Sequence, residues 1–138
     1  MARPEAHAAE KAQSRTYLAK AEQFLASAAR SVADTQHDAA LLLAIHSAIS
    51  ATDAVTAALG GLRSADPDHL RAADLLESIA RGSEELHDRA NRLRGLLKLK
   101  NLVEYEDRRV SAREAETGVK RAERLAAWAR TQIERSQP

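Results

Sequence analysis

Residues 38 to 61 read DAALLLAIHSAISATDAVTAALGG, and their pattern indicates a long helix. The side chains expected to face the core recur at the helical period. They are Leu41, Ile45, Ala48, Ile49, Thr52, Val55 and Leu59. Gly60 and Gly61 supply a stop at the C-terminal end. The spacing therefore predicts a helix from about Asp38 to Leu59 with one buried face.

Two further helices are predicted on either side of this one. The first has an apolar face from Tyr17 to Val32 and is followed by the polar break DTQHD. In SADPD, Asp66 is the expected N-cap of the third helix and Pro67 its first residue, where a missing N–H costs nothing. We expect that helix to end at Gly82.

The last two predicted helices begin with cap sequences. Ser83 is followed by two glutamates, which places acids at the positive end of a helix dipole. The core stripe of this fourth helix is Leu86, Ala90, Leu93 and Leu97. Ser111 and Glu114 form a capping box for the fifth helix, whose buried positions continue to Ile133.

These elements predict an all-α protein, a compact antiparallel helical bundle of about five helices. No segment alternates apolar and polar residues as a half-buried strand would, and short connections favour antiparallel neighbours. A chain of 138 residues can bury a core as one domain. We expect that domain over residues 14–133, between a flexible N-terminal segment, residues 1–13, and a loose C-terminal tail, residues 134–138.

The composition excludes several kinds of site. There is no cysteine, which excludes disulfides, thiolate nucleophiles and cysteine-ligated metal clusters. The five histidines are scattered, so we expect no metal site and no cofactor. The P-loop, dinucleotide-binding and serine-esterase motifs are absent from the sequence. No apolar run reaches about 18 residues and no signal-peptide core is visible, so a cytoplasmic protein without membrane contact is expected.

The charge is small in total but unevenly distributed. The net charge of +1 does not by itself imply a polyanion partner. Residues 1–82 carry 8 basic and 10 acidic side chains, whereas residues 83–138 carry 13 basic and 10 acidic ones. Five cations follow one another without an intervening acid: Arg89, Arg92, Arg94, Lys98 and Lys100. This run fits either a solvated surface or a phosphate-contacting surface.

The stretch KLKNLVEY, residues 98 to 105, places charges in the phase of a core stripe. Lys100 and Glu104 continue the phase of Leu93 and Leu97. Either the helix leaves the bundle there and the two side chains pair at i,i+4, or a cleft gathers a cation, a carboxylate and the phenol of Tyr105.

The helix at residues 38–61 contains two polar residues at the edge of its apolar stripe, His46 and Asp53. An acid in this position needs a partner, because burial of an unpaired charge is unfavourable. Asp53 could tie this helix to a basic residue, with His46 as a packing histidine. If Asp53 meets Lys100, the pair could be a structural salt bridge or part of an active site.

The order of several segments resembles the HEPN superfamily of small helical domains, closest to compact bacterial single-domain members. The segments are YLAKAEQFLASA, DAALLLAIHSAISATDAVTAALGG, DHLRAADLLESI and LLKLKNLVEYEDRRVSAREAETGVKRAERLAAWA, and they cover residues 14 to 133. The resemblance implies a helical bundle that dimerises. It also implies either a metal-independent ribonuclease, often a toxin or defence component, or an inactive relative that binds nucleotides, RNA or protein partners.

Active members of this superfamily carry an arginine, four to six residues and a histidine near the end of the penultimate core helix. At the matching place this chain has Lys100 and Tyr105, so its motif is degenerate. Lysine can hold a phosphate without the bidentate fork, whereas tyrosine is a poor base at neutral pH. Three formal matches elsewhere are interpreted as coincidences: Arg30 to His37, Arg63 to His69 and Arg81 to His87.

The resulting hypothesis is a HEPN-like homodimeric binding module for RNA, a nucleotide or a partner protein such as an antitoxin or nucleotidyltransferase. Its predicted binding cleft consists of His46, Asp53, Lys100, Glu104 and Tyr105. Two alternatives remain open. One is a ribonuclease toxin in which Lys100 holds the phosphate and His46 or Tyr105 moves the proton. The other is a structural or regulatory dimeric helical protein.

Overall fold

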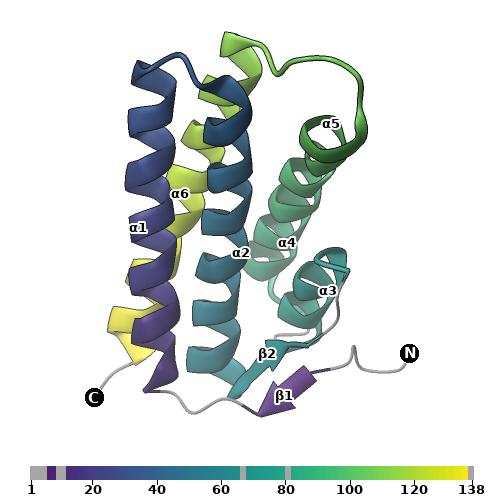
Figure 1. Cartoon of the computed structure of the whole chain (residues 1–138). Helices are drawn as coiled ribbons and strands as arrows, with labels where there is room; N and C mark the ends of the chain where they lie inside the picture. The colour runs from purple at the N-terminus through teal and green to yellow at the C-terminus, as the bar shows by residue number, and fades with distance from the viewer. Residues whose placement is uncertain (1–5, 9–11, 66–67, 80–81, 137–138) are drawn as a thin grey trace.

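The computed structural model of the chain describes residues 6–8, 12–65, 68–79 and 82–136, and helices dominate it (Figure 1). The described helices are α1 (Gln13–Ala33), α2 (His37–Gly60), α3 (Leu70–Ile79), α4 (Glu84–Leu97), α5 (Lys100–Tyr105) and α6 (Ala112–Ser136). Two short strands, β1 (Ala6–Ala8) and β2 (Leu62–Ser64), complete the elements of these residues. The predicted all-α bundle is confirmed, and α6 extends to Ser136, into the predicted C-terminal tail.

Helix α2 occupies the centre of the bundle. It packs most extensively on α1 and α6, and on its other side it contacts α3, α4 and α5 (Figure 1). Its alanines at positions 40, 44, 48, 51 and 54 are completely buried. Small side chains on this helix allow neighbouring backbones to approach closely, which is why an Ala-rich sequence forms the core.

Among the described residues, α2 is also the one helix long and apolar enough to cross a membrane by length and composition. However, 67% of its apolar window is buried inside the bundle. A core helix of a globular domain has this pattern, so the finding is weak evidence for a membrane span.

The helix ends confirm the cap predictions that fall within the described residues. The backbone N–H of Leu86 donates to Ser83 Oγ at 3.3 Å. In the capping box, Ser111 N–H donates to Glu114 Oε1 at 2.9 Å and Glu114 N–H to Ser111 Oγ at 3.1 Å. Gly61 ends α2 in the left-handed region at φ 65°. The predicted cap residues Asp66 and Pro67 lie outside the described residues.

Two features differ from the predicted elements. Strand β1 pairs antiparallel with β2, in the register Ala6↔Ser64. A pair of three-residue strands can form through backbone hydrogen bonds alone. The sequence therefore need not show the apolar alternation that predicts a longer strand. In addition, α4 ends at Leu97 instead of continuing through Glu104, because Leu99 N–H donates to Leu96 O at 3.1 Å in a tighter turn before α5 begins.

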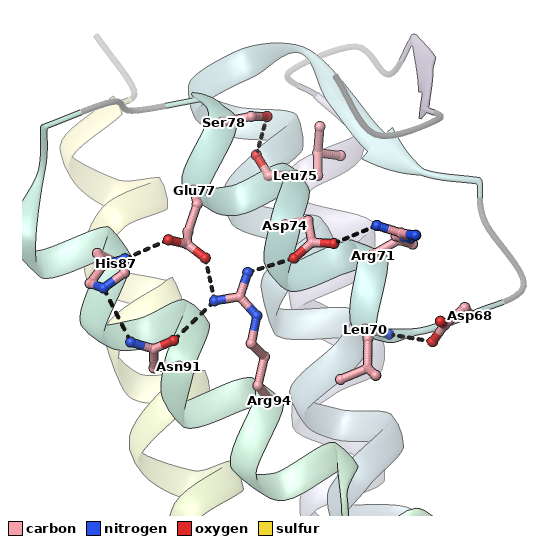
Figure 2. Close-up of polar contacts among 10 residues, drawn as sticks. All are labelled: Asp68, Leu70, Arg71, Asp74, Leu75, Glu77, Ser78, His87, Asn91 and Arg94. Carbon is pink, nitrogen blue, oxygen red and sulfur yellow. Dashed lines mark hydrogen bonds and ion pairs between the residues drawn. The ribbon is translucent and has the colours of Figure 1, made fainter. Parts of the chain in front are cut away.

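A network of charged side chains joins α3 to α4 (Figure 2). The guanidinium of Arg94 lies between two carboxylates of α3, donating to Asp74 Oδ1 at 2.6 Å and pairing with Glu77. It also donates to Asn91 Oδ1 at 3.0 Å, and His87 contacts Glu77. Burial raises the pKa of Asp74 and Glu77, but the hydrogen bonds they accept outweigh it, so both pKa values lie below the usual range. We call Asp74, Glu77 and Arg94 the α3–α4 clasp.

Candidate functional site

Four of the chain's polar side chains converge where α2, the start of α3 and α5 meet. They are His46 from α2, His69 just before α3, and Lys100 and Glu104 from α5. The ring centroids of His46 and His69 are 6.2 Å apart and the rings are nearly perpendicular, at 81°. The ring centroid of His46 also lies 6.2 Å from that of Phe24 in α1. We call Phe24, His46 and His69 the aromatic row.

The environment keeps both imidazoles of the row neutral. Burial lowers the pKa of His46 and so does the positive charge of Lys100, against a smaller opposing effect of Glu104. Burial also lowers the pKa of His69, with contributions from Lys100 and His46 that Asp68 and Glu104 oppose. Since an ordinary histidine titrates near 6.5, both rings are predominantly uncharged at pH 7.

Lys100 and Glu104 form an ion pair beside the row. Lys100 Nζ lies 3.3 Å from Glu104 Oε1, and the two side chains are 27% and 28% exposed. This is the i,i+4 pairing that the sequence suggested. The pair is accessible enough to exchange partners, so an anionic ligand can compete with Glu104 for the ammonium group.

Tyr105 does not join this cluster. Its side chain is 77% exposed, at the C-terminal end of α5. Of the two alternatives for this stretch, the structure therefore shows the i,i+4 pair without the phenol beside it. Neighbours in a helix point about 100° apart, so the residue that follows Glu104 is directed away from the side of α5 that carries the ion pair.

Asp53 lies in an adjoining cavity and not against Lys100. The cavity has a volume of about 240 Å³, and its lining includes Asp53, Arg63, Ser64 and His69. Among the described residues, Asp53 has no ion pair within 4.0 Å, so the suggested bridge to Lys100 is absent. Ser64 Oγ is buried there without a hydrogen-bond partner in the described part of the chain. His69 connects the cavity with the aromatic row.

His69 is the residue of the candidate site that the sequence interpretation did not include. It is the second member of the formal match Arg63 to His69, which was interpreted as a coincidence. Both residues line the same cavity. The spacing pointed to them, but only the packing of β2 and α3 on α2 brings them beside Asp53.

Replacing Asp53 with asparagine should flatten the pH dependence of stability. Burial raises the pKa of Asp53 to about 7, although the charge of Arg63 opposes this shift. In the unfolded chain the Asp53 carboxyl group loses its proton near its ordinary pKa of 3.8, whereas in the folded chain it keeps the proton up to about pH 7. Because the folded state then binds more protons, stability falls as the pH rises through this window.

In urea denaturation, Asp53→Asn should match the wild type at pH 4 and exceed its free energy of unfolding by about 1 to 3 kcal/mol at pH 8. Asp107→Asn, at an exposed position, is the matched control. An unchanged pH dependence in Asp53→Asn would contradict the prediction.

The fold and the polar cluster define a small helical-bundle domain with a candidate site at the junction of α2, α3 and α5. The family model described as "HEPN domain" matches residues 14–132. This match covers most of the chain, so the chain belongs to the HEPN family, as the resemblance suggested. No curated protein and no solved structure matches it. Among the described residues, no group of three or more His, Asp or Glu side chains could hold a metal ion.

Proposed function

We propose that this HEPN domain binds RNA or a nucleotide at the aromatic row, with a base against the rings and a phosphate on Lys100. The observation that carries the proposal is the row itself, three rings from three segments spaced at 6.2 Å beside a partly exposed ammonium group. Aromatic and imidazole rings stack on unpaired bases, and lysine binds phosphate as a point charge.

The neutral state of the histidines supports binding over catalysis. RNA cleavage without a metal needs one group to accept a proton and another to donate one. Two imidazoles with lowered pKa values can accept protons at pH 7 but are poor donors. Tyr105, the residue at the family's histidine position, is exposed to solvent. A neutral ring also stacks on a base without the cost of burying a charge.

A second candidate function is a metal-independent ribonuclease. The observation in its favour is the short distance between His46 and His69, which allows a neutral ring to take the 2′-hydroxyl proton and the other ring, in the fraction of molecules where it is protonated, to give its proton to the leaving oxygen. Lys100 would then stabilise charge on the phosphate.

Titration calorimetry with adenosine monophosphate tests the binding function. Lys100→Ala should weaken affinity about tenfold, the loss of one charge-assisted contact. His46→Ala should weaken it too, because a stacking ring is removed. The matched control is Lys98→Ala, which removes an exposed lysine two residues away. Equal affinities of the Lys100 and Lys98 variants would refute the role of Lys100.

The same proteins, incubated with RNA and a chelator, separate the two candidates. Intact RNA supports binding alone. RNA fragments that form with the wild-type protein but not with His69→Ala would support the ribonuclease function.

Membership of the family supports further proposals about assembly and setting. We propose that the chain is a cytoplasmic bacterial homodimer that acts with an antitoxin or nucleotidyltransferase partner in a toxin–antitoxin or defence system. We also propose that residues 14–133 form the functional domain. A monomer in sedimentation velocity at high protein concentration would refute the dimer.

A further inference from the structure

A second polar surface lies between α4 and α6, apart from the aromatic row. Two adjoining cavities of about 440 Å³ each follow these helices and share Arg89, Arg92 and Arg124 in their linings. Arg121 lines the first cavity and Arg135 the second. We call this surface, defined by the five arginines, the arginine groove.

The arginines come from regular positions on two facing helices. On α4, Arg89 and Arg92 are three residues apart, and on α6 Arg121, Arg124 and Arg135 recur at intervals that keep one helix face. At about 1.5 Å per residue, Arg121 and Arg135 are about 21 Å apart along α6. The groove is therefore long enough to contact several units of an extended chain, whereas a single small anion would occupy only part of it.

Much of the positive charge in the groove is not neutralised within the described residues. Arg121, Arg124 and Arg135 form no ion pair there. Arg92 pairs with Asp88 at 2.8 Å, but both side chains are more than half exposed, so the pair is weak. Glu85, the acid in the lining, accepts a hydrogen bond from Trp128 Nε1 at 2.9 Å. The guanidinium of Arg89 lies 5.4 Å from the centre of the Trp128 ring.

The lining of the groove exposes more apolar than polar surface, but none of the large hydrophobic side chains in it is itself exposed. Its apolar floor includes Leu96, Leu125 and Trp128, which are all buried. The large hydrophobic side chains that are exposed in the described chain, Leu59, Leu70 and Tyr105, all lie elsewhere. A partner helix normally binds by burying an apolar stripe, and charged residues are depleted from the cores of such interfaces. A ligand that carries its negative charge on a repeating backbone suits this groove better.

We infer that the arginine groove binds the phosphate backbone of single-stranded RNA. Guanidinium groups hold phosphates through paired N–H donors, and a positively charged groove tracks a strand without reading its sequence. The inference rests on the proposed function for the class of ligand. It assigns a separate contact on different residues, which extends binding beyond one nucleotide.

Fluorescence anisotropy with a labelled, unstructured 12-nucleotide RNA tests the groove. Arg121→Gln/Arg124→Gln should bind the RNA roughly 10- to 30-fold more weakly at 0.1 M salt. Its slope of log affinity against log salt should be smaller by about 1.4, since each phosphate contact on a single strand contributes about 0.7.

The matched control is Arg15→Gln/Arg113→Gln, which removes the same charge from exposed arginines outside the groove. It should stay within about twofold of the wild type. Equal affinities of the two double variants would overturn the inference. So would wild-type binding of an acidic 12-residue peptide as tight as that of the RNA, because the groove would then be a site for acidic protein segments.

Binding of adenosine monophosphate shows whether the groove proposal or the aromatic-row proposal is wrong. The groove variant should bind this nucleotide with wild-type affinity, whereas Lys100→Ala should bind it more weakly. If the Lys100 variant is normal but the groove variant loses RNA, the function proposed for the row fails and the groove stands.

Discussion

Replacing Arg94 with alanine should lower the free energy of unfolding by about 2 kcal/mol. This value lies between the ~1 kcal/mol or less of an exposed pair and the ~3 to 5 kcal/mol expected when a buried pair loses one partner. Arg94 is 26% exposed, and Asp74 and Glu77 are 31% and 27% exposed, so the clasp is partly screened by solvent. Without the guanidinium, two neighbouring carboxylates of α3 would face α4 without a cation between them (Figure 2).

Urea denaturation at pH 7 measures this effect. The matched control is Arg92→Ala, which removes an exposed i,i+4 pair two residues away and should cost about 0.5 kcal/mol or less. A loss for Arg94→Ala no larger than that of the control would contradict the clasp. Adding Asp74→Asn and Glu77→Gln to Arg94→Ala should restore part of the lost stability, because the two negative charges that lost the guanidinium are removed, although Arg71 and His87 still contact these side chains.

The penalty of Arg94→Ala should also depend on pH in a defined direction. The folded-state pKa values of Asp74 and Glu77 are lowered, so their stabilising effect is present above their ordinary values of 3.8 and 4.5. It is lost as the pH falls below these values. The difference in the free energy of unfolding between wild type and Arg94→Ala should therefore become smaller towards pH 3. A difference that stays constant would show that the variant loses stability through packing and not through charge.

Replacing Gly118 with valine should lower the free energy of unfolding by about 3 kcal/mol, the upper part of the range for overpacking. A Cβ atom at position 118 would lie 2.5 Å from Leu41 Cδ1. Leu41 is completely buried, so its side chain cannot turn into solvent to make room. The new side chain would push α6 away from α2, and the contact between these helices is among the most extensive in the bundle.

Gly95→Val is the matched control for Gly118→Val. Gly95 is also within a helix, but a Cβ atom there would meet nothing within 4 Å. Its effect should stay within about 0.5 kcal/mol, because valine has a slightly better helix propensity than glycine. Adding Leu41→Ala to Gly118→Val should cost less than Leu41→Ala costs in the wild type, since the valine fills the space left by the leucine. Strict additivity would contradict a contact between positions 41 and 118.

The elements of this fold could be predicted from local chemistry. Apolar periodicity located the long helices to within a few residues, and the caps at Ser83 and Ser111 are present as expected. The break between α4 and α5 was missed because the apolar phase of Leu93 and Leu97 continues through it. Strands β1 and β2 were missed because their pairing joins segments more than fifty residues apart by backbone groups alone.

The candidate site was predicted only in part. The pairing of Lys100 with Glu104 follows from their spacing on one helix turn, so the sequence could predict it. Tyr105 is exposed to solvent and does not join this pair, and His69 was overlooked. From the sequence, Arg94 was identified only as one of a run of cations. Its pairing with acids of α3 was not predicted, because no local pattern links residues about twenty positions apart.

By itself the sequence determined the helices, their ends, the family and the i,i+4 ion pair, because each depends on residues a few positions apart or on their order. Only the tertiary structure decided which polar side chains meet. His46 and His69 face each other because α2 and α3 pack together, and the five arginines form one groove because α4 lies beside α6. Such juxtapositions depend on how helices cross, and the helical period of one segment carries no information about the face that its neighbour presents.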